Sequence, residues 1–477
     1  MKRNFKISKV LCGALLLSAS FTLVGCNKDD NVIMIWGPEE HRAMYTELAE
    51  QFKKENPSCN ARFEFAAQGD AGAYANMSID PQAGGSIVSY PNDQLNNLNR
   101  IGAVAPILGE NLTWIKEKNT EATVEAGKIG DTYYGYPIQG DNGYYMYFNR
   151  DAFINTSVWD TATDSLKNDY TFRDLYKALD EKGGKWANGQ VSWAIGDSWY
   201  VSGVFFGAGA NYDVRYNEEG EQIASTNTFG FEGEDMKTGD FTKGLHAVEA
   251  LKNSFTTEDG KLSPHYMYSD ADKAALNDNI SKYKTDAEKP LAAVICGTWK
   301  AKEIQEAWGD NYDATLLPML EGKDGVKFRM KTFAGYKLLG VNPLCKYASK
   351  SEENLMMLHK AARFFSDYDS QIKRYDITGA GPSNKEALAS EKISKDVALQ
   401  ALNAQYDVAC TDAKGQDNGK GYRSQDSVPQ NYWTPIQAFG AALYNEVTSG
   451  KGTQFNTEAN TKITLAQLQA DISAASK

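Results

Sequence analysis

Apolar and polar positions near the start of the chain follow two different periods. "VIMIW" is an apolar run of strand length, and it ends at Gly37 and Pro38. After it, Met44, Leu48 and Phe52 recur every four residues, which places them on one face of a helix. "KKENPS" predicts the end of that helix, and "ARFEFAA" alternates as a half-buried strand does. A strand, a helix and a strand in this order predict an α/β fold with parallel strands covered by helices.

The loops after these strands are the first candidates for a binding site. "GGSIVSYPNDQ" contains a third short strand. The carboxyl ends of parallel strands share one edge of a sheet, and ligands bind there in α/β proteins. We therefore expect residues 36–40, 68–70 and 90–93 to lie on one rim.

The rest of the chain adds further elements. "TFRDLYKALDEKG" predicts a helix, and "PLAAVICGTWKAKEIQEAWG" predicts a strand, a turn and a helix with Thr298 as N-cap and Trp299 in the first turn. "YDATLLPM" predicts another strand. The polar stretch 411–426, "TDAKGQDNGKGYRSQD", predicts an exposed loop.

Length and charge narrow the class of protein. A chain of 477 residues can form two or more compact units. Its formal net charge of -12 disfavours binding to nucleic acid or to an anionic membrane surface, because both need a basic face.

The N-terminus predicts export. A basic start, "MKRNFKISKV", precedes an apolar stretch that is short for a membrane-spanning helix, so residues 1–25 are expected to be a signal peptide. Its end, "LVGC", resembles a bacterial lipobox, which would make Cys26 the lipidated residue and 26–31 a lipidated tether. The alternative is an ordinary secretion signal that contains a cysteine.

No catalytic or cofactor motif stands out. The four histidines lack metal-ligand spacing, and the chain has no complete glycine fingerprint and no G-x-S-x-G elbow. We expect no metal and no cofactor. A glycoside hydrolase needs only two carboxylates, so composition leaves that class open.

The mature chain would keep four cysteines besides Cys26, namely Cys59, Cys296, Cys345 and Cys410. We expect them to be small buried side chains, and a disulfide between two of them is the alternative.

Aromatic residues stand beside carboxylates in the predicted loops. A sugar ring has an apolar C–H face and a polar rim, so flat rings with acceptors around them suit a carbohydrate. The combinations are Trp36 with Glu39 and Glu40, Tyr90 with Asp93, Asp141 with Tyr144 and Tyr145, Trp199 with Tyr200, Trp299, and Trp433.

Several segments along the chain together resemble those of a known protein family. Seven segments are similar to extracellular solute-binding proteins of ABC sugar importers, most closely the maltose and maltodextrin-binding branch: "LVGC", "VIMIWGPEEHRAMYTELAEQFKKENP", "DTYYGYPIQGDNGYYMYFNRDAF", "AAVICGTWKAKEIQEAWGDNYDATLLPML", "FAGYKLLGVN", "ITGAGPSN" and "VPQNYWTPIQAFGAALYNEVTSGKG". The resemblance implies an α/β fold of type II, the two-lobed periplasmic-binding-protein-like fold, with the ligand cleft between the lobes. It implies lobe one at 32–138 and 338–378, and lobe two at 139–337 and 379–477.

The resemblance also assigns residues. "YYGYPIQGD" would be the first crossing between lobes, with Asp141 or Asn142 as the hinge contact, while Tyr136, Tyr145 and Tyr147 would serve packing. The implied ligand contacts are Trp36, Glu39, Glu40, Gln68, Asp70, Tyr90, Asp93, Asp141, Trp199, Tyr200, Trp299 and Trp433.

The implied function is binding rather than catalysis. The chain would be a monomeric protein, lipid-anchored on the outer face of the cell membrane, that captures maltooligosaccharides for an ABC permease. A surface glycoside hydrolase, a binder of another oligosaccharide and a structural surface lipoprotein are the alternatives.

Overall fold

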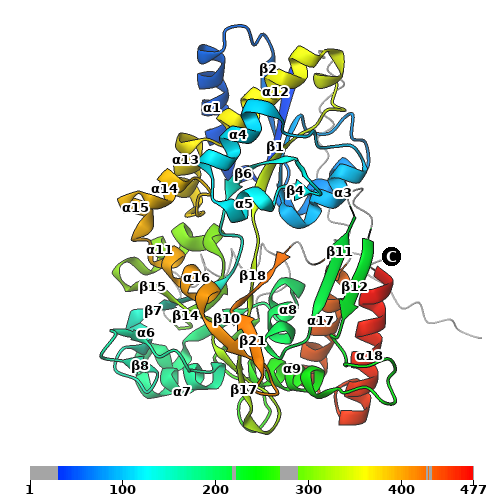
Figure 1. The fold of residues 1–477 in the computed structure, drawn as a ribbon. Helices are drawn as coiled ribbons and strands as arrows, with labels where there is room; N and C mark the ends of the chain where they lie inside the picture. Colours follow the sequence, from blue (N-terminus) through cyan, green and yellow to red (C-terminus); the bar gives the residue numbers. More distant parts are fainter. Residues whose placement is uncertain (1–30, 218–221, 269–287, 426–427, 429–431, 476–477) are drawn as a thin grey trace, which may run out of the picture.

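Two five-stranded sheets organise the chain, and they lie one above the other in Figure 1. The computed structural model describes residues 31–217, 222–268, 288–425, 428 and 432–475. Residues 1–30 lie outside this range, and with them the predicted signal peptide and Cys26. We name the sheet that begins the described chain, together with its helices, lobe one, and the other lobe two.

The sheet of lobe one has the strand order β2-β1-β3-β19-β6. β1 pairs in parallel with both β2 and β3, as predicted, and β19 pairs antiparallel with β3 and β6. The carboxyl ends of β1, β2 and β3 therefore share one edge. The strands are β1 (Val32–Gly37), β2 (Arg62–Ala67), β3 (Ile87–Pro91), β6 (Gly135–Gln139) and β19 (Lys337–Val341).

The helix predicted after the first strand is confirmed as α1 (Arg42–Glu55). Met44, Leu48 and Phe52 are all buried in one hydrophobic cluster of lobe one. The Phe52 ring makes an edge contact with Phe63 of β2 at 5.7 Å between centroids, so α1 is fixed against the sheet by aromatic packing.

The sheet of lobe two repeats the arrangement with the order β13-β10-β14-β7-β15. β10 is parallel to β13 and β14, whereas β7 is antiparallel to β14 and β15. The strands are β7 (Tyr145–Asn149), β10 (Gln190–Trp193), β13 (Tyr266–Tyr268), β14 (Leu291–Cys296) and β15 (Tyr312–Thr315).

The first crossing between the lobes is the one predicted. The chain leaves lobe one at the end of β6 and enters lobe two as β7, and residues 140–144 make the connection. Tyr136, Tyr145 and Tyr147 have no exposed surface, which confirms that they serve packing. The exact lobe boundaries given above stay a prediction.

Within the described residues, helices and six two-stranded ribbons complete the lobes. The other helices are α2 (Ala73–Met77), α3 (Leu95–Arg100), α4 (Gly109–Lys118), α5 (Glu121–Glu125), α6 (Arg150–Phe153), α7 (Phe172–Lys182), α8 (Ser198–Gly207), α9 (Thr242–Asn253), α11 (Ala301–Trp308), α12 (Glu352–Phe364), α13 (Tyr368–Thr378), α14 (Lys385–Ala389), α15 (Glu391–Ser394), α16 (Val397–Asp407), α17 (Trp433–Ser449) and α18 (Glu458–Ala475). The ribbons pair β4 (Lys128–Ile129) with β5 (Thr132–Tyr133), β8 (Trp159–Asp160) with β9 (Ser165–Leu166), β11 (Tyr212–Tyr216) with β12 (Gln222–Asn227), β16 (Met319–Glu321) with β17 (Lys327–Arg329), β18 (Thr332–Ala334) with β22 (Tyr422–Ser424), and β20 (Ala409–Thr411) with β21 (Asp417–Lys420). No helix in the described ranges is long and apolar enough to cross a membrane.

The stretch 411–426 was predicted to be an exposed loop, and residues 414–420 are indeed mostly exposed, but the prediction of a loop is wrong. The stretch contains β21 and β22, and β22 pairs in parallel with β18. Gly421 makes this possible, because a Cβ there would lie 2.0 Å from the backbone oxygen of Gln405. A close backbone contact of this kind leaves no signal in hydropathy.

Two smaller predictions have opposite outcomes. Thr298 is not an N-cap. Gly297 is the N-cap of the short 3-10 helix η5 (Thr298–Lys300), Lys300 is the N-cap of α11, and neither helix has a side-chain cap. The prediction of small buried cysteines is confirmed, because all four described cysteines are free and buried.

Candidate functional site

Polar side chains from both lobes meet between the two sheets. His41, Asp70 and Asn92 lie in the short helices η1 (Glu39–His41), η2 (Asp70–Gly72) and η3 (Asn92–Gln94), which follow the carboxyl ends of β1, β2 and β3. Thr298 follows the carboxyl end of β14 in lobe two. We define the polar cluster as His41, Asp70, Asn92, Gln139, Asp141, Thr298 and Arg374, all of them buried.

The polar cluster concentrates buried polar atoms that have no hydrogen-bond partner. Leaving such a group unsatisfied costs about 1 to 3 kcal/mol, so proteins rarely gather several in one place without a use for them. Within the described residues these atoms include His41 Nε2, Asp70 Oδ1, Asn92 Nδ2, Gln139 Nε2, Asp141 Oδ1, Thr298 Oγ1, and Nε and Nη1 of Arg374.

Asp141 lies where the two lobes are joined. Its Oδ2 accepts a hydrogen bond from the Gly381 N–H at 2.5 Å, which ties the first crossing to the segment after α13. Burial raises the pKa of Asp141 to about 6, although Thr298, the Gly381 N–H, Gln139 and Lys337 act to lower it. Thr298 and Gln139 lie near the carboxyl group but outside hydrogen-bond geometry.

A salt bridge places the carboxylate of Asp70. Asp70 Oδ2 lies 2.9 Å from Lys337 Nζ at the start of β19. Burial acts to raise the pKa of Asp70, but Lys337 and Ser89 outweigh it and hold the pKa below its usual value. Asp70 therefore stays ionised, and its Oδ1 is buried without a hydrogen-bond partner.

Gln425 connects the lobes directly. Its side-chain Nε2 donates to Asp93 Oδ1 at 3.0 Å, and its Oε1 accepts from Asn142 Nδ2 at 2.8 Å. Gln425 follows β22 in lobe two, whereas Asp93 lies in η3 of lobe one. The backbone of Gly335 leaves the necessary room, since a Cβ there would lie 1.8 Å from Gln425 Oε1.

An aromatic cluster of lobe two, consisting of Tyr144, Trp199, Phe333 and Trp433, adjoins these polar groups. The Trp199 ring stacks on Phe333 at 4.6 Å and lies 5.5 Å from Trp433. Asp197 caps α8 by accepting from the Trp199 N–H at 2.9 Å, which fixes the start of the helix. Phe333 precedes Gly335 by two residues, and Gly335 lies against the Gln425 side chain. The Phe333 end of the aromatic cluster is therefore close to Gln425.

A cavity of about 410 Å³ opens between the lobes beside the polar cluster. Asn92 forms part of its wall, and Arg423 and Ser424 face it from lobe two. In Figure 1 the β11–β12 ribbon rises from lobe two toward α3 at this place. The other lining residues are Leu95, Asn96, Ala126, Lys128, Ile129, Gly130, Asp213, Val214 and Asn217.

Three predicted contacts of lobe one lie at the rim. Glu39 and Glu40 are exposed, and Glu39 forms an ion pair with Arg42 at 2.7 Å. Gln68 is half-buried, and its Oε1 accepts from Asn76 Nδ2 at 2.7 Å. All three are on the predicted edge of the sheet, but none belongs to the polar cluster.

Two other predicted contacts of lobe one pack against the protein. Tyr90 has no exposed surface, and its ring lies on the backbone of Gly340, where a Cβ would come within 2.8 Å of it. Trp36 is half-buried against Gly85. This conformation therefore gives Tyr90 a core position rather than a ligand-facing one.

The remaining predicted rings of lobe two differ in exposure. Tyr200 is 5% exposed, and its ring centroid lies 4.9 Å from that of Tyr144. Trp299 is half-buried at the turn after β14, and its ring lies directly over Gly297. Part of the Trp299 side chain is therefore accessible to solvent, whereas Tyr200 is buried and packs against Tyr144 of the aromatic cluster.

Sequence reasoning missed several groups that the fold brings to the site. Gln425 stood in a stretch interpreted as a loop, and Lys337, Phe333 and Arg374 were not singled out. The glycine and aromatic residues of "FAGYKLLGVN" were the only local signal near Phe333 and Lys337. Among the described residues, no group of three His, Cys, Asp or Glu side chains could hold a metal ion.

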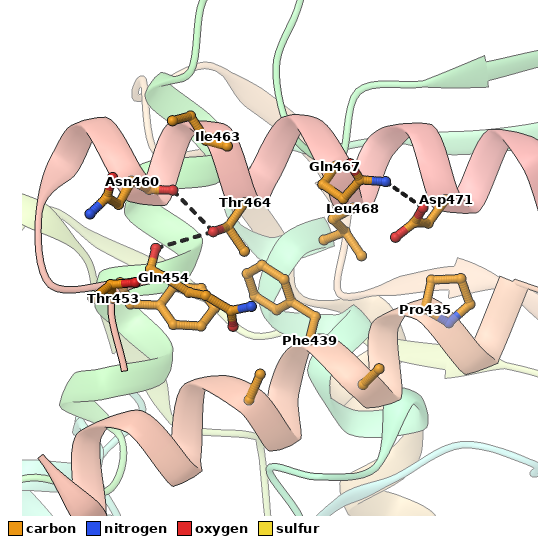
Figure 2. Close-up of a pocket in the computed structure, with 13 residues that line it drawn as sticks. Pro435, Phe439, Thr453, Gln454, Asn460, Ile463, Thr464, Gln467, Leu468 and Asp471 are labelled. Carbon is orange, nitrogen blue, oxygen red and sulfur yellow. Dashed lines mark hydrogen bonds between the residues drawn. The ribbon is translucent and has the colours of Figure 1, made fainter. Parts of the chain in front are cut away.

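A second hollow lies away from the lobe junction. Figure 2 shows a groove of about 460 Å³ between α17 and α18, with Phe439 and Leu468 at its floor. Ile463 at its border is 57% exposed. Thr464 Oγ1 is already hydrogen-bonded within the groove, to the backbone oxygens of Asn460 and Gln454 at 3.0 and 3.1 Å.

The two-lobed geometry agrees with a family of binding proteins. The family model for bacterial extracellular solute-binding proteins matches residues 47–401, and the chain belongs to this family. A comparison with curated protein sequences finds no match.

Solved structures of sugar-binding proteins share the fold. A structure solved with acarbose has a TM-score of 0.68 at 21% identity, covering 94% of this chain and 99% of the other. The maltodextrin-binding protein of L. casei BL23 without ligand has a TM-score of 0.62 at 19% identity, with 93% and 98% covered. MalX from Streptococcus pneumoniae in complex with maltopentaose has a TM-score of 0.60 at 18% identity, with 92% and 99% covered. The type II fold predicted from the sequence is confirmed.

Proposed function

We propose that this chain is a monomeric, lipid-anchored binding protein that captures maltooligosaccharides between its lobes and delivers them to an ABC permease. The observation that carries the proposal is the group of unsatisfied donors and acceptors in the polar cluster, beside the aromatic cluster. A sugar hydroxyl both donates and accepts, so one polyol can serve Asp70 Oδ1 and Asp141 Oδ1 as well as the donors Asn92 Nδ2 and Gln139 Nε2.

The aromatic cluster supplies the other half of sugar recognition. Trp199 and Trp433 are half-buried, so each keeps part of its ring available to the apolar face of a pyranose. The choice of maltooligosaccharides is supported by the structural neighbour that was solved with maltopentaose. Cys26 is the proposed anchor, and it places the protein on the outer face of the membrane.

A thermal-shift panel tests the proposal. The mature protein from residue 27 onward is melted with malto-, xylo-, galacto- and fructo-oligosaccharides. A ligand at a hundred times its Kd stabilises the folded state by about 2.7 kcal/mol, which raises Tm by roughly 5 to 10 °C for a lobe of this size. We expect this shift with maltotriose and longer homologues.

The same samples separate the alternatives. They are analysed for shorter sugars after incubation, because a hydrolase releases products and a binding protein does not. A shift with a different glycan class would correct the ligand but keep the binding role. No shift with any of the sugars, or the release of shorter sugars, would overturn the proposal.

A further inference from the structure

Arg374 is a buried cation that has no anionic partner. The side chain lies on α13 and is 1% exposed. Nη2 donates to Tyr45 Oη at 2.7 Å, but Nε and Nη1 make no hydrogen bond. Among the described residues, no carboxylate forms an ion pair with it. An uncompensated buried charge is strongly unfavourable, and proteins normally pair it.

The nearest charged groups do not neutralise Arg374. Asp70 is the carboxylate of this neighbourhood, and it is already paired with Lys337. Burial and then the charge of Arg374 lower the pKa of His41 to about 3, so that histidine stays neutral. Because the Asp70 carboxylate is paired with Lys337, the Arg374 guanidinium remains without a carboxylate of its own.

Two further features add donors to the same place. His41 Nε2 is buried without a partner, and in the Nε2–H tautomer it donates. His41 is also the N-cap of α1, a helix of 14 residues without a side-chain cap. The partial positive charge at a helix N-terminus favours an anion. The unpartnered N–H groups of Arg374, the His41 donor and the first turn of α1 therefore lie in one place.

We propose that Arg374, His41 and the start of α1 form a binding site for one singly charged anion. The anion is either a free ion, such as a halide or a small carboxylate, or a carboxylate group carried by the captured glycan. The free-ion form does not depend on sugar binding. The glycan form rests on the proposed function and adds to it a preference for oligosaccharides that carry a carboxylate.

The free-ion form is tested on the mature protein in sodium bromide and sodium formate, with the sodium salt of a bulky sulfonate buffer keeping the ionic strength constant. We expect Tm to rise by several degrees as either anion saturates the site. Arg374→Gln should abolish the rise. Lys373→Gln is the matched control, because Lys373 precedes Arg374 on α13 but is exposed at the surface and paired with Glu47. It should keep the rise.

If Arg374→Gln does not fold, a second measurement tests the free-ion form on the wild-type protein. Crystals of the wild-type protein grown in sodium bromide should show an anomalous peak within about 3.5 Å of the Arg374 guanidinium, a normal contact distance for such a pair. A water molecule there, with no bromide and no anion-dependent rise in Tm, rejects the free-ion form.

The glycan form is tested by calorimetry with maltotriose and with maltotriose oxidised to a carboxylate at its terminal C6. We expect the acidic sugar to bind at least tenfold more tightly to the wild type, and Arg374→Gln to lose that preference. If neither this preference nor the bromide site is found, the proposal is wrong. Binding of neutral maltotriose in the same titrations reports separately on the proposed function.

Discussion

Gly297→Ala tests whether Trp299 is a platform for the sugar. A Cβ on Gly297 would lie 1.9 Å from Trp299 Cζ3 and 2.3 Å from Cη2, whereas ordinary contact begins at 3.4 Å. Gly297 has φ of -96° and ψ of -176°, an extended conformation open to alanine. The substitution therefore displaces the ring by about 1.5 Å without straining the backbone.

The size of the effect follows from this displacement. A tryptophan that anchors a ligand contributes about 2 kcal/mol or more to binding. A gap of 0.5 to 1 Å already removes a quarter to a half of a dispersion contact. We expect Gly297→Ala to weaken maltotriose binding by about fivefold, and Trp299→Ala by more than tenfold, which corresponds to 1.4 kcal/mol.

Calorimetric titration measures both variants beside a matched control. Gly69→Ala makes the same chemical change near the polar cluster, but a Cβ there would meet nothing within 4 Å. Its affinity should stay within about twofold of the wild type, well under a tenfold change of 1.4 kcal/mol. If Trp299→Ala keeps its affinity within about threefold but loses about 3 to 5 kcal/mol of folding stability, Trp299 packs the turn and is not a platform.

Three further predictions concern the junction and the anchor. Burial raises the pKa of Asp141 to about 6 in the folded protein, so the contribution of its protonated form to stability is present below pH 4 and is lost as pH rises through 6. Asp141→Asn should reduce the change in unfolding free energy over this pH window by about 3 kcal/mol, and an unchanged pH dependence contradicts the burial argument. Gln425→Ala removes the hydrogen bonds of Gln425 to Asp93 and to Asn142, so small-angle scattering of the unliganded variant should give a larger radius of gyration than the wild type. Equal values mean that these bonds do not hold the lobes together. Cys26→Ala should release the protein from membranes or leave an uncleaved precursor, whereas a wild-type protein recovered soluble and starting beyond residue 26 would refute lipidation.

Local periodicity was enough to predict the framework of the fold. The four-residue spacing of Met44, Leu48 and Phe52 and the alternation in "ARFEFAA" depend on neighbours along the chain, and the structure has α1 and β2 at these places. The crossing from β6 to β7 was found through the family resemblance, because its tyrosine-rich segments are distinctive in sequence.

The binding groups were harder to predict because they depend on contacts between distant segments. Gln425 reaches Asp93 across 332 positions of sequence, and its place is set by the pairing of β18 with β22. Arg374 has the sequence context of an ordinary helix surface, and only the packing of α13 against α1 and η1 makes it buried. Tyr90 is the converse case, since this aromatic residue next to a loop acid was predicted to contact the ligand and lies in a hydrophobic cluster in this structure.

The most direct test of the account is a crystal structure of the mature protein with the maltooligosaccharide that gives the largest thermal shift. We predict sugar density between the lobes, with hydroxyl groups within hydrogen-bond distance of Asp70 and Asp141 and a pyranose ring against Trp199 or Trp433. Sugar bound only in the groove between α17 and α18 (Figure 2), or only on the outer surface of one lobe, would contradict the account.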